Sequence, residues 1–564
     1  MADDSESLLW ARRVSGAQYL SAWRIIEQAP PLLQDSLVAR YCRIAGPERR
    51  IYDAGDGRVG DSFMDAFTDL RRIGHALREV RPTRAFDDDE LEELADLAAR
   101  HCMSEPSLQA AQAYALGQGV RLPTGPRVSA KGLRRRLISP DWWRRRLRTM
   151  LTRRAEELFR RLGEVRKQTS AYISGDALHR IRQAAFKSRL WLSEMAAVCE
   201  ETGESLRLSD IAEHSLANPT LRRGELMLRA RGFQEVAEVL GHRCLMVTAT
   251  CPSAFHAWRS DGQPNPVYNG STPREAQRWL SKQWARVRAT LQRRRVTYYG
   301  IRASEPHHDG TPHWHLVIYA PASELFRVRI IMRKAWLSEY ADEPGALKHR
   351  IRFTAENASK GSGAAYIAKY VAKNIDGAGD IGNERSDESG RLISDDAQRA
   401  VAWARLHGIR QFQQLRGPSV TLWRELRRVR QRCDCPPLEA LRATTDETPE
   451  HAPSWSEFIG ELGGIDHCLK RSRELFDKRE PRRTDDAGRI VIKLTRWGEL
   501  PTPIVVGLKL VYRDRIHRLP THVFVWVLIF SPLGPVAITV RGPTYGSPFG
   551  WTNPQESSQA PPSS

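Results

Sequence analysis

Two histidines at alternate positions, His313 and His315, are the residues of this chain whose types and spacing best suit chemistry. Alternate residues of a β-strand point to the same face, so both imidazoles would share one face while Trp314 points to the other. Glu305 lies upstream, across a turn at Gly310, and a carboxylate on the neighbouring strand would reach the same place. The pattern predicts a metal site of two imidazoles and one carboxylate.

The identity of the third ligand and of the metal depends on ligand chemistry. His307 and His308 compete with Glu305 for the third place. Nitrogen and oxygen ligands with open coordination positions suit a hard divalent ion such as Mg²⁺ or Mn²⁺, and the lack of a nearby third thiolate disfavours structural zinc. Such an ion would act as a Lewis acid on an oxygen of a phosphate group.

A second group of reactive side chains lies in the segment Ala364 to Asn374, which is predicted to be a helix. Tyr366 and Tyr370 are spaced four residues apart, so their phenols would share one helical face, with Lys369 and Lys373 interleaved. A free phenol has a pKa of about 10 and needs help to react at neutral pH. The lysines could lower that pKa or balance charge on a phosphate. A tyrosine pair alone is typical of core packing, but beside the histidine strand it favours transesterification of a DNA phosphodiester through a phosphotyrosine.

Three segments in this order resemble the phage replication gene A protein family: Val247 to His256, Glu305 to His315, and Tyr366 to Asn374. That family consists of rolling-circle initiators of the HUH endonuclease class, named for two histidines that flank a hydrophobic residue. The similarity is expected to span residues 170 to 430.

The resemblance implies roles for individual residues. His313 and His315 would be the paired metal ligands, Glu305 the third, and Tyr366 and Tyr370 the two nucleophiles. A family member nicks one strand of single-stranded or supercoiled origin DNA, stays joined to the 5′ phosphate, and leaves a 3′-OH for a host polymerase. The second tyrosine later cuts the regenerated origin, and the freed 3′ end closes a circle. The sequence contains no Gly-x-x-x-x-Gly-Lys-Ser/Thr phosphate loop, so a host helicase is an expected partner.

The elements that would position these residues alternate between strands and helices. Cys244 to Thr250 is predicted to be a strand, and a capping box at Thr272 opens a helix that runs to about Arg295. Val296 to Ala303 is predicted to be the strand that leads into the histidine strand. This order predicts an α+β fold of the HUH type: an antiparallel sheet flanked by helices, with the site on one face of the sheet. The segment Asp376 to Ser394 is predicted to be a flexible loop.

The chain has 564 residues, which suggests several domains. We expect a helical N-terminal region at residues 1–125 and a basic, helical DNA-binding region at residues 126–240. The HUH endonuclease domain follows at residues 241–432. Residues 433–564 are expected to hold additional helices, a linker at 436–453 and a disordered tail after residue 541.

The net charge of +20, from 87 Lys and Arg against 67 Asp and Glu, favours a polyanionic partner, with nucleic acid first. Basic residues crowd between Lys131 and Lys167, where Trp142 and Trp143 could serve as stacking platforms for bases. The alternative interpretation of this stretch is a solvated helix face.

Cysteine usage and hydropathy predict the compartment. Eight cysteines are too sparse for a disulfide framework in a chain of this length, which suits a reducing cytoplasm. Cys433, Cys435, His467 and Cys468 form a weaker zinc candidate, because only one residue separates Cys433 from Cys435, which is tighter than usual.

The start of the chain is acidic and does not resemble a signal peptide. The longest apolar run, Val523 to Phe530, is too short to span a membrane and is predicted to be a buried strand. We expect a protein of the bacterial host cytoplasm with no membrane partner.

The leading hypothesis is a site- and strand-specific DNA endonuclease that initiates rolling-circle phage replication and rejoins the strand. A transposase or plasmid relaxase of the same chemical class is the nearest alternative. The histidine strand precedes the tyrosine helix, which favours the order of replication initiators over that of conjugative relaxases. A non-cleaving DNA-binding regulator, whose binding would be indifferent to metal and to tyrosine substitution, is the alternative from another class.

Overall fold

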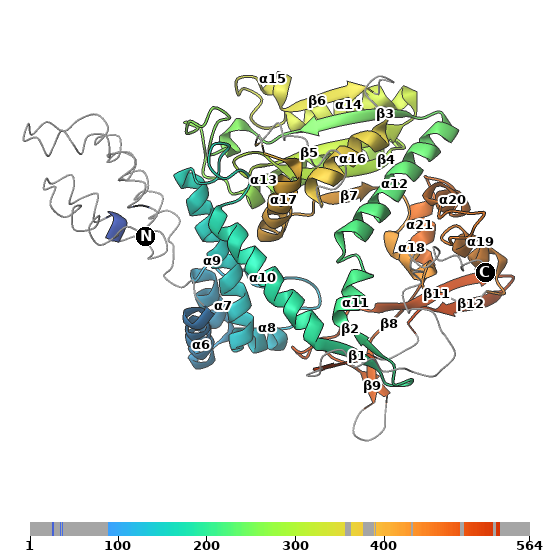
Figure 1. Cartoon of the computed structure of the whole chain (residues 1–564), viewed down its shortest axis with the longest axis horizontal. Helices are drawn as coiled ribbons and strands as arrows, with labels where there is room; N and C mark the ends of the chain where they lie inside the picture. Colours follow the sequence, from blue (N-terminus) through green and yellow to red (C-terminus); the bar gives the residue numbers. More distant parts are fainter. Residues whose placement is uncertain are drawn as a thin grey trace, which may run out of the picture. The chain divides into compact units, whose positions relative to one another are not determined.

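The computed structural model describes residues 25–27, 34, 37, 88–355, 362–375, 389, 391–429, 433–484, 490–522 and 526–530. The chain divides into two compact units. Figure 1 labels their helices and strands, which are coloured along the sequence. The first consists of residues 1–177, 257–266 and 494–500, and the second of residues 178–256, 267–493 and 501–564. No helix in the described part of the chain has the length and apolar character needed to cross a membrane.

The first unit is built from four described helices, which are α6 (Asp88–Ser104), α7 (Leu108–Gly117), α8 (Ala130–Leu137) and α9 (Pro140–Leu162). Helix α9 begins with proline at its first turn and ends at Gly163, whose φ of 81° suits a left-handed C-cap. Its apolar residues recur at helical spacing and pack against α6 in one core.

Trp142 and Trp143 lie inside that core, with 4% and 0% of their surfaces exposed. The indole nitrogen of Trp143 donates a hydrogen bond to the carbonyl of Leu137 at 2.7 Å. The prediction that these two rings are stacking platforms for DNA is therefore wrong. Both fall on the apolar face of α9, and burial of such large rings outweighs any exposed role.

The second unit contains a five-stranded sheet in the order β6-β3-β5-β4-β7, in which every pair is antiparallel. The strands are β3 (Arg243–Ala249), β4 (Tyr299–Pro306), β5 (Pro312–Ala320), β6 (Ile351–Ala355) and β7 (Phe412–Leu415). The predicted α+β class with an antiparallel sheet is confirmed. Strand β4 begins three residues later than expected, and β7 was not predicted from the sequence.

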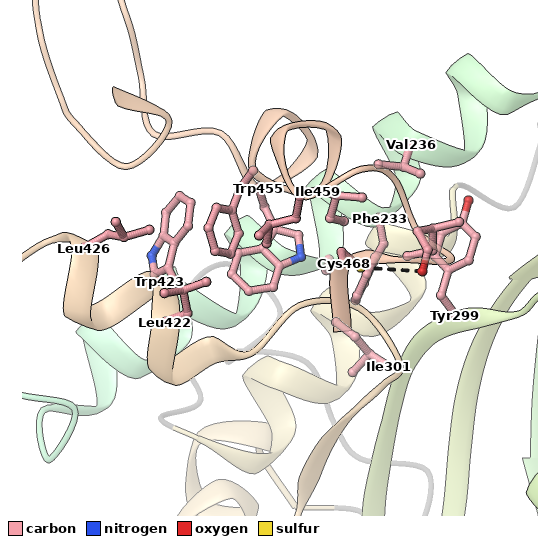
Figure 2. Close-up of a cluster of buried hydrophobic side chains, with 14 of the residues drawn as sticks. Phe233, Val236, Tyr299, Ile301, Leu422, Trp423, Leu426, Trp455, Ile459 and Cys468 are labelled. Atoms are coloured by element: carbon pink, nitrogen blue, oxygen red, sulfur yellow. Dashed lines mark hydrogen bonds between the residues drawn. The ribbon is translucent and has the colours of Figure 1, made fainter. Parts of the chain in front are cut away.

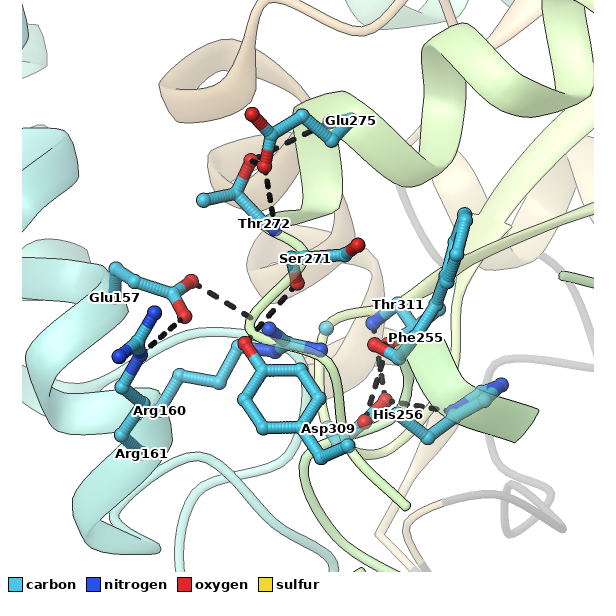
Figure 3. A network of polar contacts seen from close by, with 12 residues as sticks. Glu157, Arg160, Arg161, Phe255, His256, Ser271, Thr272, Glu275, Asp309 and Thr311 are labelled. Carbon is cyan, nitrogen blue, oxygen red and sulfur yellow. Dashed lines mark hydrogen bonds and ion pairs between the residues drawn. The ribbon is translucent and has the colours of Figure 1, made fainter. Parts of the chain in front are cut away.

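Helices cover both faces of this sheet. Trp314, Leu316 and Ile318 point to one face, where they pack with α13 (Pro273–Arg293) and α14 (Ala322–Trp336). The predicted capping box is present, since Thr272 and Glu275 cap each other at the start of α13 (Figure 3).

The opposite face packs against α12 (Pro219–Leu240) and α16 (Gly363–Asn374). Its core continues into the C-terminal helices, as Figure 2 shows for the aromatic rings of Phe233, Trp423 and Trp455. Trp423 and Trp455 meet with ring centroids 5.2 Å apart. This face of the sheet is the one that carries His313 and His315.

A second sheet interrupts the region predicted to be helical between residues 170 and 242. Helix α10 (Gly175–Glu194) leads into β1 (Met195–Cys199) and β2 (Ser205–Arg207), followed by α11 (Leu208–Glu213). Strand β13 (Trp526–Phe530) pairs with β1. Its residues are largely exposed, so the prediction of a buried strand there is right about the strand and wrong about its burial.

The predicted linker at 436–453 contains a helix. Leu438 and Leu441 of α19 (Pro436–Ala443) are buried in the core shared with α12, because their spacing of three residues places both on one helical face. The predicted loop at 376–394 lies mostly outside the described residues, and its last two residues belong to α17 (Ile393–His407), so its predicted end is two residues too late. The predicted tail after residue 541 also lies outside the described residues.

The other described helices of the second unit are a 3₁₀ helix, η2 (Ser253–Phe255), and the α-helices α15 (Ala346–His349), α17 (Ile393–His407), α18 (Val420–Leu426), α19 (Pro436–Ala443), α20 (Trp455–Glu461) and α21 (Cys468–Glu474). The other described strands are β8 (Phe476–Arg479), β9 (Arg482–Thr484), β10 (Ile490–Ile492), β11 (Ile504–Tyr512) and β12 (Arg515–Pro520). Strands β8, β11 and β12 form a third sheet, and β9 and β10 form a two-stranded ribbon.

Candidate metal and tyrosine site

The hairpin of β4 and β5 positions the first candidate residues. Glu305 pairs directly with His313 across the hairpin, and His315 lies two residues further along the same strand. Gly310 adopts a φ of 78° in the turn, a conformation that glycine enters without steric cost. The backbone N–H of His307 donates to the carbonyl of Thr311 at 2.8 Å, which closes the turn.

Buried polar contacts hold this turn rigid. One carboxylate oxygen of Asp309 accepts a hydrogen bond from the backbone N–H of Thr311 at 3.0 Å, and the other lies 3.1 Å from the Thr311 hydroxyl. His256 Nδ1 lies 3.3 Å from the same carboxylate (Figure 3). Trp403 donates from its indole nitrogen to the carbonyl of Gly310 at 2.8 Å. The segment containing Cys251 and His256, which the sequence singled out, thus supports the turn beside the site.

Glu305, His313 and His315 form a group that could hold a metal ion, with one ligand atom from each lying within 4.8 Å of the others. A carboxylate oxygen of Glu305 is 4.0 Å from Nε2 of His313 and 3.7 Å from Nε2 of His315. All three side chains are buried. Among the described residues, these three form the group found whose potential ligand atoms lie this close together.

His307 and His308, the sequence alternatives for the third ligand, lie next to this group and outside it. The ring of His307 stacks on the ring of His313 with centroids 4.0 Å apart and an interplanar angle of 27°. His308 is buried. The structure places the carboxylate of Glu305 within reach of both strand histidines.

The electrostatics of the three residues fit a divalent cation. Burial lowers the pKa of His313 well below its ordinary value, and the neighbouring His307 and His315 add to the effect. The imidazole is therefore neutral near pH 7, which is the form that binds metals. Its Nδ1 is buried without a hydrogen-bond partner among the described residues. Two imidazoles and a carboxylate make a donor set for a hard divalent ion.

The two ring nitrogens of His315 have different neighbours, and Nε2 is the one that could bind a metal ion. Its Nδ1 lies 3.3 Å from the hydroxyl of Thr248 on β3 and 3.2 Å from the phenol oxygen of Tyr366. Nε2 is the nitrogen that faces Glu305. Contacts of this kind orient a ligating imidazole.

The zinc candidate formed by Cys433, Cys435, His467 and Cys468 is a poorer metal site than the group of Glu305, His313 and His315. Burial raises the pKa of Cys468 to about 12 and also raises the pKa of Cys433. Zinc binds thiolates, so protonated thiols disfavour it. These cysteines do not belong to any group of potential metal ligands found in the described part of the chain.

Helix α16 brings both predicted tyrosines to the histidine face. Ser362 caps the helix by accepting from the backbone N–H of Ala365 at 3.2 Å. The ring of Tyr370 stacks on His315, with centroids 4.0 Å apart and an interplanar angle of 15°. Tyr366 and Tyr370 meet edge to face at 4.9 Å. Tyr366 is half-buried and Tyr370 is 8% exposed.

The side of α16 that carries the tyrosines also anchors the helix to the sheet. Ile367 and Val371 belong to the buried core beneath the helix. Gly363 allows a close approach, because a Cβ at this position would lie 2.5 Å from the Tyr319 hydroxyl and 2.8 Å from the sulfur of Cys244. The helix is thereby held at a short distance from the strand that carries the histidines.

The two predicted lysines differ in exposure. Lys369 is exposed, whereas Lys373 is half-buried. The charge of Lys373 contributes to the lowered pKa of His313, so this ammonium lies near the histidine cluster.

Asn374 is a residue of the site that sequence reasoning did not assign. It is 1% exposed, and its amide nitrogen donates to the carboxylate of Glu305 and, at 2.9 Å, to the carbonyl of Tyr370. Its amide oxygen accepts from the side chain of Gln411 at 3.2 Å. Its position one turn after Tyr370, on the same face, is the sequence signal that could have revealed it.

Residues 89–378 match the model of a family described as bacteriophage replication gene A protein (GPA). This match covers more than half of the chain. The protein belongs to the bacteriophage replication gene A protein family. The match begins earlier and ends earlier than the span of 170 to 430 expected from the motifs, and it includes both histidines and both tyrosines.

Individual relatives agree with this assignment. The replication gene A protein of Escherichia phage 186 is 37% identical over 332 residues, which cover 58% of this chain and 47% of the relative. The replication protein of Haemophilus phage HP1 is 40% identical over 296 residues, covering 52% and 38%. A probable replication endonuclease from a prophage-like region of Salmonella paratyphi A is 34% identical over 374 residues, covering 63% and 46%.

This gene A family member therefore matches only about half the length of these relatives, or less. No solved structure matches the chain.

Proposed function

We propose that this protein is a site- and strand-specific DNA endonuclease that initiates rolling-circle replication of phage DNA and later rejoins the strand. The observation that carries the proposal is the contact between the tyrosine helix and the candidate metal ligands. The phenol oxygen of Tyr366 lies 3.2 Å from His315, and the ring of Tyr370 stacks on the same imidazole. The names of several relatives, which include probable replication endonucleases, support the same conclusion.

Glu305, His313 and His315 would hold a divalent ion, Mg²⁺ or Mn²⁺. When bound, such an ion supplies Lewis-acid polarisation of a non-bridging oxygen of the scissile phosphate. The chain itself supplies the nucleophile and the positioning. Burial of the three ligands keeps bulk water away from the reacting phosphate.

The cleavage step is a transesterification. The phenol oxygen of Tyr366 or Tyr370 attacks the phosphorus, a new tyrosine–phosphorus bond forms, and the bond to the 3′ oxygen breaks. The phenol proton leaves and the departing 3′ oxygen gains a proton, so charge balances. Lys369 and Lys373 would offset negative charge as the phosphate gains its fifth oxygen. The phosphodiester energy is conserved in the phosphotyrosine, so rejoining needs no ATP.

The second tyrosine gives the enzyme a way to end replication. With one tyrosine joined to the 5′ end, the other can cut the regenerated origin and release a new 3′-OH. That hydroxyl attacks the first phosphotyrosine, which frees the tyrosine and closes the circle. The two phenols meet edge to face at a ring separation of 4.9 Å, so both can serve one phosphate position in turn.

The substrate would be single-stranded or supercoiled origin DNA in the bacterial cytoplasm, consistent with a net charge of +20. A host helicase would supply unwinding and a host polymerase would extend the 3′-OH. A transposase or relaxase of the same chemistry is the second candidate, but the family assignment favours the replication role.

The alternative hypothesis of a non-cleaving DNA-binding regulator predicts a different effect of substitutions at the metal ligands. Under the proposal, His313→Ala abolishes metal-dependent nicking and leaves DNA affinity within a few-fold of wild type, because the imidazole binds the ion and not the DNA. Nicking is measured on supercoiled origin plasmid and affinity by fluorescence anisotropy. Equal loss of nicking and binding would indicate a structural role for the histidine.

The decisive experiment is capture of the covalent intermediate. The protein is incubated with Mn²⁺ and single-stranded oligonucleotides tiled across the DNA that flanks its gene, each labelled at either the 5′ or the 3′ end. A denaturing protein gel should show an adduct that carries only the 3′-labelled fragment. The adduct should disappear in EDTA and in the Tyr366→Phe/Tyr370→Phe double variant. Its absence with every strand would overturn the proposal.

A further inference from the structure

The second unit contains a hollow of about 880 Å³ that the proposed chemistry does not use. It lies along the edge strand β7, between residues of α13 and α21, and Trp284 and Tyr298 are among the residues that line it. The hollow is within the size range of sites for small molecules and nucleotides, which spans about 300–1,000 Å³.

Cationic and amide side chains surround the hollow. Arg288 comes from α13, Arg416 follows β7, and Lys470 and Arg473 come from α21. Lys470 has a carboxylate, Glu474, at 3.9 Å. In the part of the chain that the structure describes, no carboxylate lies within ion-pair distance of Arg288, Arg416 or Arg473.

The guanidinium of Arg416 lies over the ring of Tyr298, 4.8 Å from its centroid, and closes one side of the hollow. Gln292 and Gln413 add amide groups to the wall, which can donate and accept hydrogen bonds. Asp466, the other acid in the wall, accepts a hydrogen bond from Thr297 at 2.8 Å. Three arginines without acidic partners around a concave site make a receptor for an anion.

We propose that this hollow binds an unpaired nucleotide of the single-stranded DNA that flanks the cleavage site. Guanidinium groups contact the phosphate, and the amides contact the edge of the base. A concave site of nucleotide size favours a flipped or unpaired base over the continuous backbone of a duplex, which would need an extended basic stripe.

Strands β7 and β4 connect the hollow with the region of the tyrosine site. Gln413 and Leu415 of β7 pair with Arg302 and Gly300 of β4, and Glu305 lies further along β4. From Arg302 and from Gly300 to Glu305 the strand rises by about 10 Å and about 16 Å, at roughly 3.3 Å per residue. These lengths correspond to about three to five stacked nucleotides at roughly 3.4 Å each. The hollow would therefore hold DNA at a distance from the cut phosphate, an inference that rests on the proposed endonuclease function.

The test compares two double variants of the full chain. Arg288→Ala/Arg473→Ala removes two exposed cations of the hollow. Arg243→Ala/Arg278→Ala is the matched control, because these two arginines are also exposed in the same unit but lie outside the hollow. The probe is a fluorescent oligo-dT of about 16 nucleotides, the upper site size for one single-strand-binding module. Its dissociation constant is measured by anisotropy over a range of salt concentrations.

The hollow variant should bind the oligonucleotide on the order of tenfold more weakly, as expected for lost charge-assisted contacts. The slope of log affinity against log salt should fall by about 1.4, the value for two phosphate contacts on a single strand. Arg288→Lys/Arg473→Lys should restore the slope, since it keeps both charges. A hollow variant that matches the control in affinity and slope would overturn the proposal. Equal weakening for a duplex of the same length would overturn the assignment to an unpaired nucleotide.

Cleavage is measured separately with a short oligonucleotide that spans only the cut site. The hollow variant should form the covalent adduct at saturating concentration as wild type does. Loss of adduct with this short strand would place the arginines in the tyrosine site and overturn the inference. If wild type itself forms no adduct, the endonuclease proposal fails, while the anisotropy comparison still decides whether the hollow binds single strands.

Discussion

At the scale of residues, the candidate site brings together side chains to which the proposed function gives one role each. The three candidate ligands lie on adjacent strands, and the tyrosines reach them from a helix. Asn374 joins these two groups, since it donates both to Glu305 and to the backbone of the tyrosine helix. Because Gln411 in turn holds Asn374, the carboxylate has a fixed orientation before any ion binds.

We expect Asn374→Ala to weaken Mn²⁺ binding by about 10- to 100-fold, the usual effect of losing a partner of a metal ligand. The Glu305 carboxylate would lose a buried donor and its orientation. Isothermal titration with Mn²⁺ measures this without DNA. Gln411→Ala removes the contact with Asn374 and a hydrogen bond to the carbonyl of Ala400, and it should give a smaller loss. Unchanged Mn²⁺ affinity in the Asn374 variant would show that the asparagine serves the helix alone.

Variants that keep only one of the two tyrosines should separate the first cleavage of the origin from the second. With Tyr366→Phe or Tyr370→Phe, one phenol remains, so a covalent adduct should still form in at least one variant. Closure of a circle needs both phenols and should be lost in each. Adducts are scored on a denaturing gel and circles by exonuclease resistance of the product. Wild-type yields of circles from both variants would contradict the alternating scheme.

At the scale of elements, the distance between α16 and the sheet decides whether the tyrosines reach the histidines. Gly363 sets that distance, because nothing larger fits between the helix, Tyr319 and Cys244. The apolar residues on the inner side of α16 then hold the helix in place.

Gly363→Ala should destabilise the protein by about 1–3 kcal/mol through overpacking and should shift the tyrosine helix outward. Urea unfolding measures the loss, and adduct formation should fall with it. Gly224→Ala is the matched control, since this helical glycine of α12 has open space around its Cβ position. It should be neutral or stabilising by up to about 1 kcal/mol. Equal behaviour of the two variants would refute the close-packing argument.

At the scale of the whole molecule, the net charge of +20 would determine how the protein meets DNA under the proposed function. The basic stretch between Lys131 and Lys167 lies on α8 and α9, and its arginines divide into two groups. Arg134 donates to backbone carbonyls of Met103 and Glu105, and Arg136 pairs with Glu499 at 2.6 Å. These contacts stabilise the first unit. Arg135 and Arg145 are exposed and remain candidates for phosphate contact.

Affinity for single-stranded DNA should fall steeply with salt, and Arg135→Ala/Arg145→Ala should lower the slope by about 0.7 for each phosphate contact removed. Anisotropy titrations at several salt concentrations measure the slope. Arg136→Ala should instead lower the melting temperature, because it leaves Glu499 buried without its cation. A salt response that is flat for wild type would remove the phosphate-contact hypothesis for this stretch.

The hairpin and the helix of the site could be predicted from the sequence, because strand alternation and helical spacing are local rules. His313 and His315 share a face for that reason, as do Tyr366 and Tyr370. Which distant segments meet became known from the folded structure. The contact of Asn374 with Glu305, the burial of Trp142 and the hollow beside Arg288 each join residues far apart in the chain. A local pattern can place Asn374 on the tyrosine face of its helix, but which distant residue it contacts depends on the packing of whole elements.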